Sequence, residues 1–403
     1  KGVKRSYGFA KYLHDSLPNA TYVGFTGTPI DATIDVFGDV VDSYTMTESV
    51  ADGITRRIVY EGRAAKVFAD HKQLEAIEAY YKECEEQGAN EYQIEESKKA
   101  VTQMNKILGD PNRLSVVARD FIEHYEKRIE EGSTVCGKAM FVCSSREIAY
   151  DLYKQIIALR PEWEKKIGSE DQTPVERIRL VMTREKDDDP ILRELIGSDE
   201  DRKALDVLFK NPDSNFKIAI VVSMWITGFD VPCLDTMYID KPLQKHTLVQ
   251  TISRVNRVYE GKDKGLVVDY IGIKNALKQY AGGGDMGDNV ETIEQSVTMV
   301  KDELDILRRM FHTFDYRKFS TGTPLEQLEC LKHAAEFVQA TEKTQNQFMG
   351  HAKKLKSAFN LCSNHETISD KDREDIHFFT GVRSIIYKLT KGDAPDASQM
   401  NRK

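Results

Sequence analysis

Three polar side chains between positions 250 and 257 have the types and the spacing to act on a phosphate. Gln250, Arg254 and Arg257 follow one another at i, i+4 and i+7, so on a helix they would share one narrow stripe. Two guanidiniums held together suit a spread of negative charge, and a γ-phosphoryl group in transfer is the most demanding such target. Salt bridges to nearby carboxylates are the alternative, because structural ion pairs are common. The opposite stripe of the predicted helix is apolar: Leu248, Ile252, Val255 and Tyr259.

The segments around this helix predict a parallel α/β sheet that would position the two arginines. Apolar runs typical of strands lie on both sides of it, at Ile218–Val222, Thr236–Ile239 and Leu266–Val268. Strands buried on both faces that alternate with helices indicate parallel pairing. Upstream, Ala139–Cys143 and Ile178–Met182 have the same character, which gives five strands for one domain.

These motifs resemble those of a known enzyme family. The QxxxRxxR pattern resembles motif VI of superfamily-two helicases, and Thr227-Gly228-Phe229-Asp230-Val231-Pro232 resembles their motif V. The longer stretches MWITGFDVPCLDTMYIDKP, HTLVQTISRVNRV and GLVVDYIG are similar to the motor region of the R (restriction) subunit of type I restriction-modification enzymes. Two upstream stretches are similar to motifs III and IV of that family: YVGFTGTPI from Tyr22, whose Thr26–Pro29 turn would follow a strand predicted at Ala20–Phe25, and AMFVCSSR from Ala139. The resemblance covers roughly positions 1 to 280.

The resemblance implies roles at a nucleotide site. Arg257 would be the arginine finger, with Arg254 beside it and Gln250 orienting them, and Gly228 and Asp230 would complete the ATP-binding set. The turn of motif III would couple the phosphate state to the position of DNA through Thr26, Gly27 and Thr28.

The resemblance also implies contacts to the DNA backbone at the ends of strands. These would come from Ser144, Ser145, Arg146, Ser223 and Thr227. Capping of the following helix by Ser144 or Ser145 is compatible with that role. Lys241, Lys245 and His246 would form a basic approach to the surface, although solvated loop charges are the alternative.

ATP and Mg²⁺ are the expected cofactors, and by the resemblance their main ligands precede this chain. The chain would open just after the helicase DExH box, beyond the nuclease and the Walker A loop. The segment from Gly132 to Ala139 nearly fits GxxxxGK[ST], but it ends in alanine where a magnesium-binding hydroxyl belongs. The glycines at 282, 284 and 287 are interpreted as a flexible linker, and we predict no metal-ligand set within the chain.

The predicted fold class is α/β, a RecA-like (P-loop NTPase-type) parallel-sheet domain followed by an all-α helical domain. Residues 1–45 would end a first RecA-like domain, 46–110 would form an insertion or crossover, and 111–280 would be the second RecA-like domain. A linker at 281–290 would lead to the helical domain at 291–392, which is predicted from apolar stripes at helical spacing. A disordered tail is expected at 393–403.

Composition limits the class of protein further. The chain of 403 residues is 30% charged and has no apolar run of bilayer length, so we expect no membrane partner. Its six cysteines are scattered without metal-type pairs, which suits a reducing cytoplasm. The net charge of −8 excludes a globally basic DNA-coating protein but leaves room for a local basic track.

The function expected from these features is that of a motor segment of a type I restriction endonuclease R subunit. It would serve ATP-dependent translocation of double-stranded DNA before cleavage, with the methyltransferase and specificity subunits as partners. By family the protein would be a site-specific deoxyribonuclease and DNA translocase, although this chain alone is expected to be inactive. Two alternatives stay open: a non-catalytic assembly module on the same fold, and another superfamily-two DNA helicase.

Overall fold

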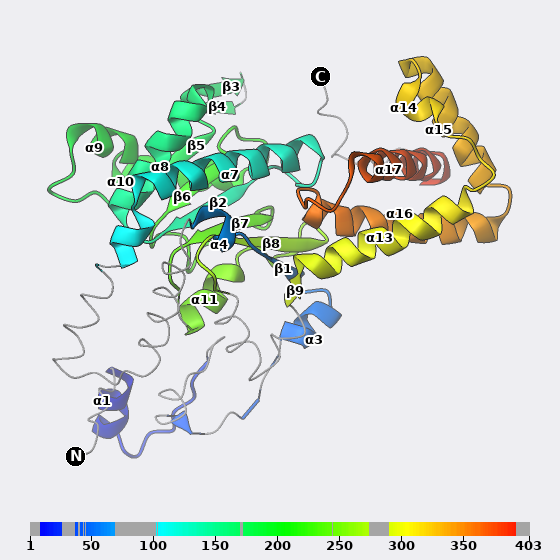
Figure 1. Ribbon diagram of the computed structural model, residues 1–403. Coiled ribbons are helices and arrows are strands. Elements are labelled where there is room, and N and C mark those ends of the chain that lie inside the picture. Colours follow the sequence, from blue (N-terminus) through cyan, green and yellow to red (C-terminus); the bar gives the residue numbers. More distant parts are fainter. Residues whose placement is uncertain are drawn as a thin grey trace. The chain divides into compact units, whose positions relative to one another are not determined.

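The computed structural model describes residues 9–25, 37–38, 41–42, 44, 46–68, 102, 104–169, 172–243, 245–273 and 290–391 (Figure 1). The chain divides into two compact units. The first comprises residues 1–122, 136–259 and 265–290, and the second comprises 123–135, 260–264 and 291–403. The predicted motif III residues Thr26, Gly27 and Thr28 lie outside the described residues, as do the linker positions 281–289 and the tail.

A seven-stranded sheet, in the order β5-β6-β2-β7-β8-β1-β9, is the centre of the first unit. The pairs β5 with β6, β6 with β2, β2 with β7 and β7 with β8 are all parallel. The strands are β1 Arg57–Gly62, β2 Ala139–Cys143, β5 Ile178–Val181, β6 Ile218–Val221, β7 Thr236–Asp240, β8 Lys264–Asp269 and β9 Val290–Thr292. All five strands predicted for the parallel-sheet domain at 111–280 are therefore confirmed. β1, from the segment predicted as an insertion or crossover, is an additional strand of the same sheet.

Burial explains why these runs are strands. Every residue of β2, β6 and β7 is buried, and their apolar and β-branched side chains face helices on both sides. The connection from β2 to β5 and the connection from β7 to β8 step across the sheet in opposite directions. Because such crossovers are right-handed, the helices within them fall on opposite faces. Figure 1 shows this arrangement for α8 (Arg146–Leu159) and α11 (Lys245–Ile252).

The remaining elements of this unit are mostly short, and several are capped by polar side chains. Ser145 accepts a hydrogen bond from the Ile148 amide at the start of α8, and Ser198 and Asp201 form a capping box. The further elements are α1 Phe9–Ser16, α3 Met46–Ala51, α4 Ala64–Val67, the 3₁₀ turn η1 Pro161–Glu164, the antiparallel pair β3 Ile167–Ser169 and β4 Gln172–Val175, α9 Pro190–Ile196 and α10 Asp199–Lys210.

Buried charge pairs hold α7 (Pro111–Glu130) against the sheet. Arg113 on α7 donates two hydrogen bonds to the Asp240 carboxylate at the end of β7, where both side chains are almost fully buried. Arg63 donates to Asp120 of α7 at 2.6 and 2.7 Å, and the Tyr270 hydroxyl donates to the same carboxylate at 2.8 Å. These contacts join α7 to segments that follow β1, β7 and β8.

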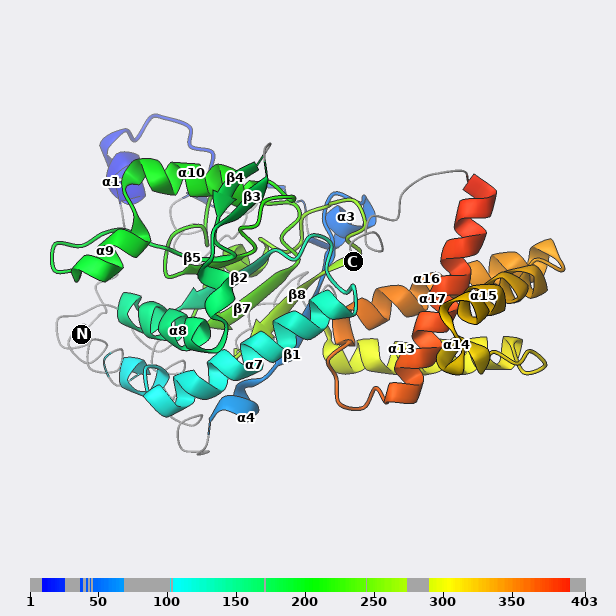
Figure 2. The same ribbon diagram turned by 90° about the horizontal axis from the view of Figure 1, so that it is seen from above.

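The second unit is helical, as predicted. Its helices are α13 Ile293–Met310, α14 Lys318–Thr321, α15 Pro324–Val338, α16 Glu342–Cys362 and α17 Asp370–Lys391. Figures 1 and 2 both show α13 and α16 alongside each other. The core is aromatic: the ring of Phe311, which is 1% exposed, has ring centroids 5.3–5.7 Å away in Phe337, Phe348, Phe378 and Phe379.

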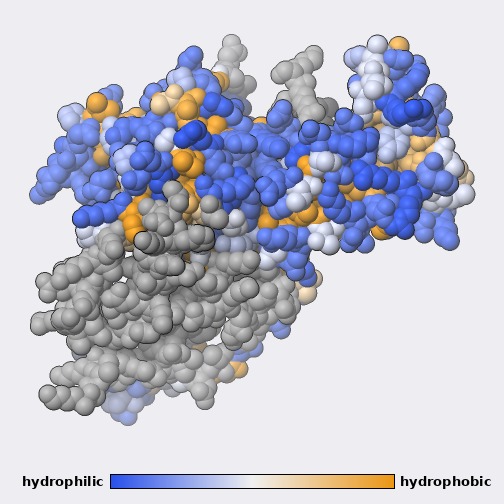
Figure 3. Space-filling model, viewed as in Figure 1, coloured by the Kyte–Doolittle hydropathy of each residue, from blue (hydrophilic) through white to orange (hydrophobic). Residues whose placement is uncertain are grey.

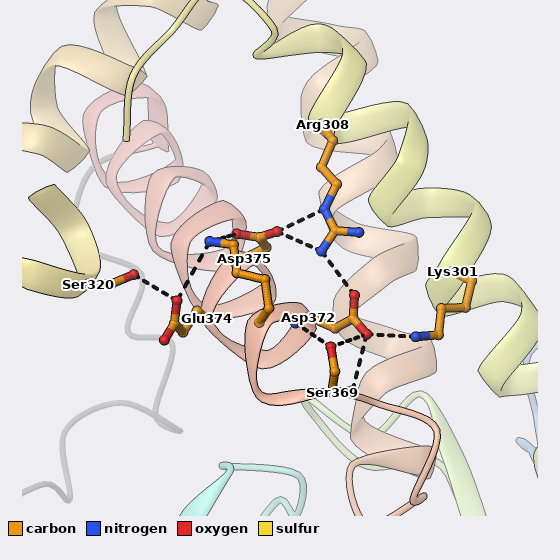
Figure 4. A network of polar contacts seen from close by, with 8 residues as sticks. Lys301, Arg308, Ser320, Ser369, Asp372, Glu374 and Asp375 are labelled. Atoms are coloured by element: carbon orange, nitrogen blue, oxygen red, sulfur yellow. Dashed lines mark hydrogen bonds and ion pairs between the residues drawn. The ribbon is translucent and has the colours of Figure 1, made fainter. Parts of the chain in front are cut away.

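A charged network links α13 to the first turn of α17 (Figure 4). Asp372 accepts hydrogen bonds from Lys301 at 2.6 Å and from Arg308 at 2.9 Å. Arg308 also donates to Asp375 at 2.8 Å, so one guanidinium joins two carboxylates of α17. Ser369 and Asp372 exchange backbone and side-chain hydrogen bonds, which caps α17.

One predicted strand is wrong. Residues 20–25, expected to form a strand before motif III, form no strand. Val23 is 68% exposed and Phe25 is 93% exposed. An apolar strand is stable only when neighbouring strands and a core cover it, and no described residue pairs with this segment in a sheet.

No helix within the described ranges is long and apolar enough to cross a membrane. On the face seen in Figure 3, the described surface is mostly hydrophilic, with smaller hydrophobic areas among the hydrophilic residues.

Candidate functional site

The two motifs that the sequence singled out are in contact in the structure. Motif V lies in the loop between β6 and β7, and motif VI lies in and after α11. The Arg254 Nη1 donates a hydrogen bond of 2.8 Å to the Phe229 carbonyl. The Arg257 Nε lies 3.1 Å from the Asp230 Oδ1. Both arginines of motif VI therefore contact adjacent residues of motif V.

The prediction that Gln250, Arg254 and Arg257 share one helical stripe is wrong. α11 ends at Ile252, and Arg254 lies in the turn that follows, where its amide donates to the Thr251 carbonyl at 3.1 Å. Arg257 has extended backbone and forms an antiparallel bridge with Thr55. The backbone at Asn256 and Arg257 pairs with residues 55 and 56, and this pairing replaces the helix that the sequence spacing predicted. The predicted apolar face is confirmed in part, since Leu248, Ile252 and Val255 are buried.

A glycine in β8 fixes the position of the turn after α11. A Cβ at Gly265 would lie 2.2 Å from the Val255 carbonyl oxygen, a distance that no side chain tolerates. The strand and the turn therefore approach each other more closely than any other residue would allow. This contact positions the backbone between Arg254 and Arg257.

Arg254 is half-buried and held in place by main-chain oxygens. Its Nε donates to the Gln250 carbonyl at 3.0 Å, and its Nη1 donates to Phe229. Gln250 therefore orients Arg254 through its backbone oxygen, whereas a side-chain role was predicted. Burial, followed by the neighbouring charge of Arg257, lowers the pKa of Arg254. Its Nη2 has no hydrogen bond to any described residue, so this nitrogen is available to an anion.

Arg257 and Asp230 form an open ion pair. Their side chains are 43% and 61% exposed, and the contact lacks hydrogen-bond geometry at the Arg257 Nε. A solvent-exposed pair of this kind contributes about 0–1 kcal/mol. The two terminal nitrogens of Arg257 make no hydrogen bond within the described part of the chain. The guanidinium can therefore exchange its carboxylate for a stronger anion at little cost.

Aromatic stacking and two left-handed residues shape the motif V loop. Gly228 has φ +68°, which glycine adopts without strain. Trp225 has φ +67°, which costs a bulky residue roughly 1–3 kcal/mol. Its indole ring stacks on Phe229 with centroids 4.2 Å apart and on Phe209 at 5.3 Å, and these contacts offset the strain. The carbonyl of Phe229, the acceptor for Arg254, is thereby held in one position.

The residues predicted to contact DNA lie at the carboxyl edge of the sheet. The parallel register pairs Val142 of β2 with Val221 of β6, so Ser144 and Ser223 follow at matching positions. Ser145 caps α8, as the alternative required, and the Ser144 Oγ is buried without a hydrogen-bond partner among the described residues. Ser223 and Thr227 are exposed. Exposed hydroxyls at such an edge can donate hydrogen bonds to phosphate oxygens.

Two basic residues that follow strands at this edge are already engaged. Arg146 pairs with Asp188, and its Nε lies 3.3 Å from Glu185. Although burial opposes it, the hydrogen bond from Arg146 lowers the pKa of the Asp188 carboxyl. Lys241 donates to the Val222 carbonyl at 2.7 Å, and burial lowers its pKa. The DNA role of Arg146 stays a prediction, and the side chains of Lys245 and His246 lie outside the described residues.

The near-match to a phosphate-binding loop is structural, as expected. Lys138 is fully buried, and its ammonium donates to the Phe216 carbonyl at 2.5 Å and to the Leu208 carbonyl at 3.4 Å. It also lies 5.1 Å from the ring centroid of Phe209. The described residues contain no cluster of three or more metal-ligating side chains.

Sequence reasoning missed the residues that act through shape or backbone. Trp225, Phe229 and Gly265 carry no charge and no recognisable functional group, so pattern searches passed over them. Gly265 did leave a signal, because a glycine inside an apolar strand often marks a close backbone approach.

Three family models match the chain. Residues 194–272, which contain both motifs, match the type I restriction enzyme subunit R domain 3. Residues 283–403 match the C-terminal region of type I restriction enzyme HindI endonuclease subunit-like proteins, and residues 4–94 match the SWI2/SNF2 ATPase model.

The curated relatives of the chain are also type I restriction enzyme endonuclease subunits. The type I restriction enzyme HindI endonuclease subunit of Haemophilus influenzae is 34% identical over 94% of this chain, and the alignment covers 38% of that protein. A putative type I restriction enzyme MjaIXP endonuclease subunit of Methanocaldococcus jannaschii is 34% identical over 98% of the chain and 37% of its own length. The chain thus spans less than two fifths of the length of these relatives.

One solved structure aligns with part of the chain. A fragment of a putative HsdR subunit of a type I restriction enzyme from Vibrio vulnificus aligns with 66% of this chain and 42% of its own, at 15% identity and a TM-score of 0.40.

Proposed function

The chain belongs to the endonuclease (R) subunit family of type I restriction enzymes, and from that premise we propose that it forms the second helicase lobe of an ATP-driven DNA motor. The proposed substrate of the motor is duplex DNA, which it translocates before cleavage. The proposed partners are the methyltransferase and specificity subunits of the complex. An ATPase-like match at residues 4–94 supports the use of ATP.

The contact between motif V and motif VI is the observation that carries this proposal. Arg254 and Arg257 are fixed against Phe229 and Asp230, yet Arg257 stays 43% exposed and keeps two nitrogens without a partner among the described residues. A purely structural arginine would be expected to use its whole fork on its own domain. The two neighbouring guanidiniums are fixed in position but keep N–H groups without an acceptor among the described residues. They therefore suit an anion that is bound by another lobe.

In the proposed reaction, Arg257 and Arg254 stabilise negative charge on a phosphoryl group. ATP with Mg²⁺, bound mainly by residues outside this chain, would supply that group for transfer to water. Arg257 would leave Asp230 and direct its terminal nitrogens to the phosphoryl oxygens, because a charge-assisted bidentate contact is stronger than an exposed ion pair. Arg254, fixed by the carbonyls of Gln250 and Phe229, would hold the turn in place and offer its Nη2.

The carboxyl edge of the sheet is the proposed half of the DNA track. Ser223 and Thr227 present exposed hydroxyls there, and Ser144, whose Oγ is buried without a partner among the described residues, lies at the same edge. Hydroxyls of this kind position a protein on the phosphodiester backbone without reading its sequence. Gly228 and Asp230 belong to the loop that leaves this edge after β6 and contacts both arginines, so the motif V loop would link nucleotide state to DNA contact.

The assembly-module alternative also has an observation in its favour. Arg257 does pair with a carboxylate of its own unit, as a vestigial arginine would. The exposure of both partners is against this alternative, since a pair retained for packing would be buried. The two proposals differ in what the loss of Arg257 does to ATP hydrolysis.

The test is DNA-stimulated ATP hydrolysis by an R subunit that contains this chain within the full length of its relatives. Arg257→Ala is expected to lower the DNA-stimulated rate by a factor on the order of 10³ to 10⁵, as removal of an arginine finger does. Arg254→Ala is expected to lower the rate as well. Arg309→Ala is a matched control, because Arg309 is an exposed arginine whose described contact is an ion pair with Asp305 one helical turn earlier.

An unchanged rate in the folded Arg257→Ala subunit would contradict the motor role of this residue and favour the assembly module. Circular dichroism and gel filtration of each variant separate loss of catalysis from loss of fold.

A further inference from the structure

Two cysteines outside the predicted site lie at matching positions of neighbouring strands. The parallel register of β2 and β7 pairs Ala139 with Thr236. Cys136 lies three residues before Ala139, and Cys233 lies three residues before Thr236. Neighbouring strands are roughly 4.8 Å apart. The Cα atoms of a disulfide are usually separated by about 4.4–6.8 Å, so this offset suits a cross-link.

The two cysteines are in contact although they are 97 residues apart in the sequence. The Cys136 Sγ lies 3.5 Å from the carbonyl oxygen of Cys233 and donates to it. Both are free thiols in the structure, with Cys136 half-buried and Cys233 1% exposed. Small reagents in solvent can therefore reach Cys136 first, and Cys233 lies behind it.

The surroundings favour a reactive sulfur. The hydrogen bond from Cys136 lowers the pKa of the Cys233 thiol to about 7, and the buried ammonium of Lys138 acts in the same direction. The hydrogen bond to Cys233 and burial raise the pKa of Cys136. One thiolate stabilised by a neighbouring thiol is the arrangement found in dithiols that exchange disulfides.

We propose that Cys136 and Cys233 form an oxidisable dithiol site that takes small disulfides and other soft, thiol-seeking electrophiles, and that closes to an intramolecular disulfide. The inference does not depend on the proposed motor function. The site would cross-link the segment entering β2 to the end of the motif V loop.

The reaction balances with a small disulfide as the oxidant. The proton of Cys136 passes to the neighbouring Cys233 thiolate, and the resulting Cys136 thiolate attacks one sulfur of oxidised glutathione, which forms a mixed disulfide and releases one glutathione thiolate. That thiolate takes the proton from Cys233. The Cys233 thiolate then attacks the Cys136 Sγ, forms the protein disulfide and releases the second glutathione. Two protein thiols are oxidised, one glutathione disulfide is reduced to two thiols, and the two thiol protons pass to the leaving groups.

The consequence for the loop follows from where Cys233 lies. It comes three residues after Asp230 and four after Phe229, the two contacts of the motif VI arginines. A covalent link at Cys233 would restrain the end of this loop at β7. Amide hydrogen exchange in the segment 226–235 is expected to slow after oxidation.

The experiment treats the reduced chain with oxidised glutathione, quenches with acid and titrates thiols in denaturant. The six thiols of the wild-type chain are expected to fall by two, and a non-reduced digest is expected to contain the peptide that joins Cys136 to Cys233. Cys233→Ser is expected to accumulate a glutathione adduct on Cys136, because the resolving thiol is missing. The Cys136→Ser variant is expected to keep all five of its remaining thiols. Cys330→Ser, at a buried cysteine of the helical unit, is the matched control and should still lose two.

A second reagent makes the test independent of oxidation. Phenylarsine oxide binds two neighbouring thiols through one arsenic, so it should protect both cysteines from maleimide in the wild-type chain and in Cys330→Ser. Protection should disappear in either single variant of the pair. Undiminished arsenical binding in Cys136→Ser, or a wild-type chain that gains only glutathione adducts without the linked peptide, would overturn the proposal.

Discussion

Arg113 and Arg257 each face an aspartate of the sheet unit, yet the two pairs differ in almost every physical respect. The side chains of Arg113 and Asp240 are 3% and 0% exposed, whereas those of Arg257 and Asp230 are 43% and 61% exposed. Arg113 gives both terminal nitrogens to its carboxylate, and Arg257 approaches its partner only through Nε. The presence of a nearby carboxylate therefore does not by itself distinguish a structural arginine from an available one.

The difference lies in what each arginine would lose on leaving its partner. Separation of the buried pair would strand a charge away from water, at a cost of several kcal/mol. Separation of the exposed pair returns both groups to solvent at a cost of about 1 kcal/mol or less. An anion-binding role is open only to the second kind of pair.

The sharpest test of this contrast is Arg113→Ala. Loss of the guanidinium leaves the Asp240 carboxylate buried and unpaired, and the free energy of unfolding is expected to fall by about 3–5 kcal/mol. Urea denaturation followed by circular dichroism measures the change. Arg257→Ala in the same assay should change it by less than about 1 kcal/mol. Equal losses in both variants would remove the distinction.

A buried cation with no carboxylate partner among the described residues extends the comparison. Burial lowers the pKa of Lys138 from 10.5 to about 8. The folded chain thus releases this proton at a lower pH than the unfolded chain, so the stability of the wild type should rise between about pH 8 and pH 10.5. The Lys138-dependent part of that rise is on the order of 2–3 kcal/mol.

Lys138→Met removes this proton and should lack that part of the rise. Thermal unfolding across this pH range, with wild type and variant measured side by side, checks the difference. Parallel pH profiles for the two proteins would mean that the ammonium is better solvated than its position indicates.

The smallest effect is expected at Asp230. Asp230→Asn removes the ion pair of Arg257 and leaves the hydrogen bond from Arg254 to Phe229 in place, so the free energy of unfolding should change by less than about 0.5–1 kcal/mol. A loss above 2 kcal/mol in urea denaturation would make the pair structural and would weaken the proposed exchange with phosphate.

The sequence predicted the central sheet well because its strands are short apolar runs that can only be buried. The helical unit was also predictable, since Phe348, Leu355 and Phe359 repeat at helical spacing and all lie in its core. The turn after α11 was not predictable in this way. The spacing from Gln250 to Arg257 fits a helix, but the bridge between Arg257 and Thr55, which are 202 positions apart in the sequence, sets the backbone.

The candidate site was predicted in its residue types and only partly in its geometry. Arg254, Arg257, Gly228 and Asp230 were named from motifs, and the structure brings them together. The acceptor of Arg254 is a main-chain carbonyl, which every residue carries, so no residue type could mark it. The strand expected before Thr26 failed because periodicity describes a segment but not the neighbours that would cover it.

Trp225, whose left-handed backbone is held by its stack on Phe229, gives the motif V loop an optical property. The chain has two tryptophans, and the other, Trp163, follows α8 in the η1 turn. Replacement of Trp163 by phenylalanine would leave a single emitter whose indole lies against the residue that accepts from Arg254. Its fluorescence would then follow any rearrangement of this loop in real time, without an attached dye.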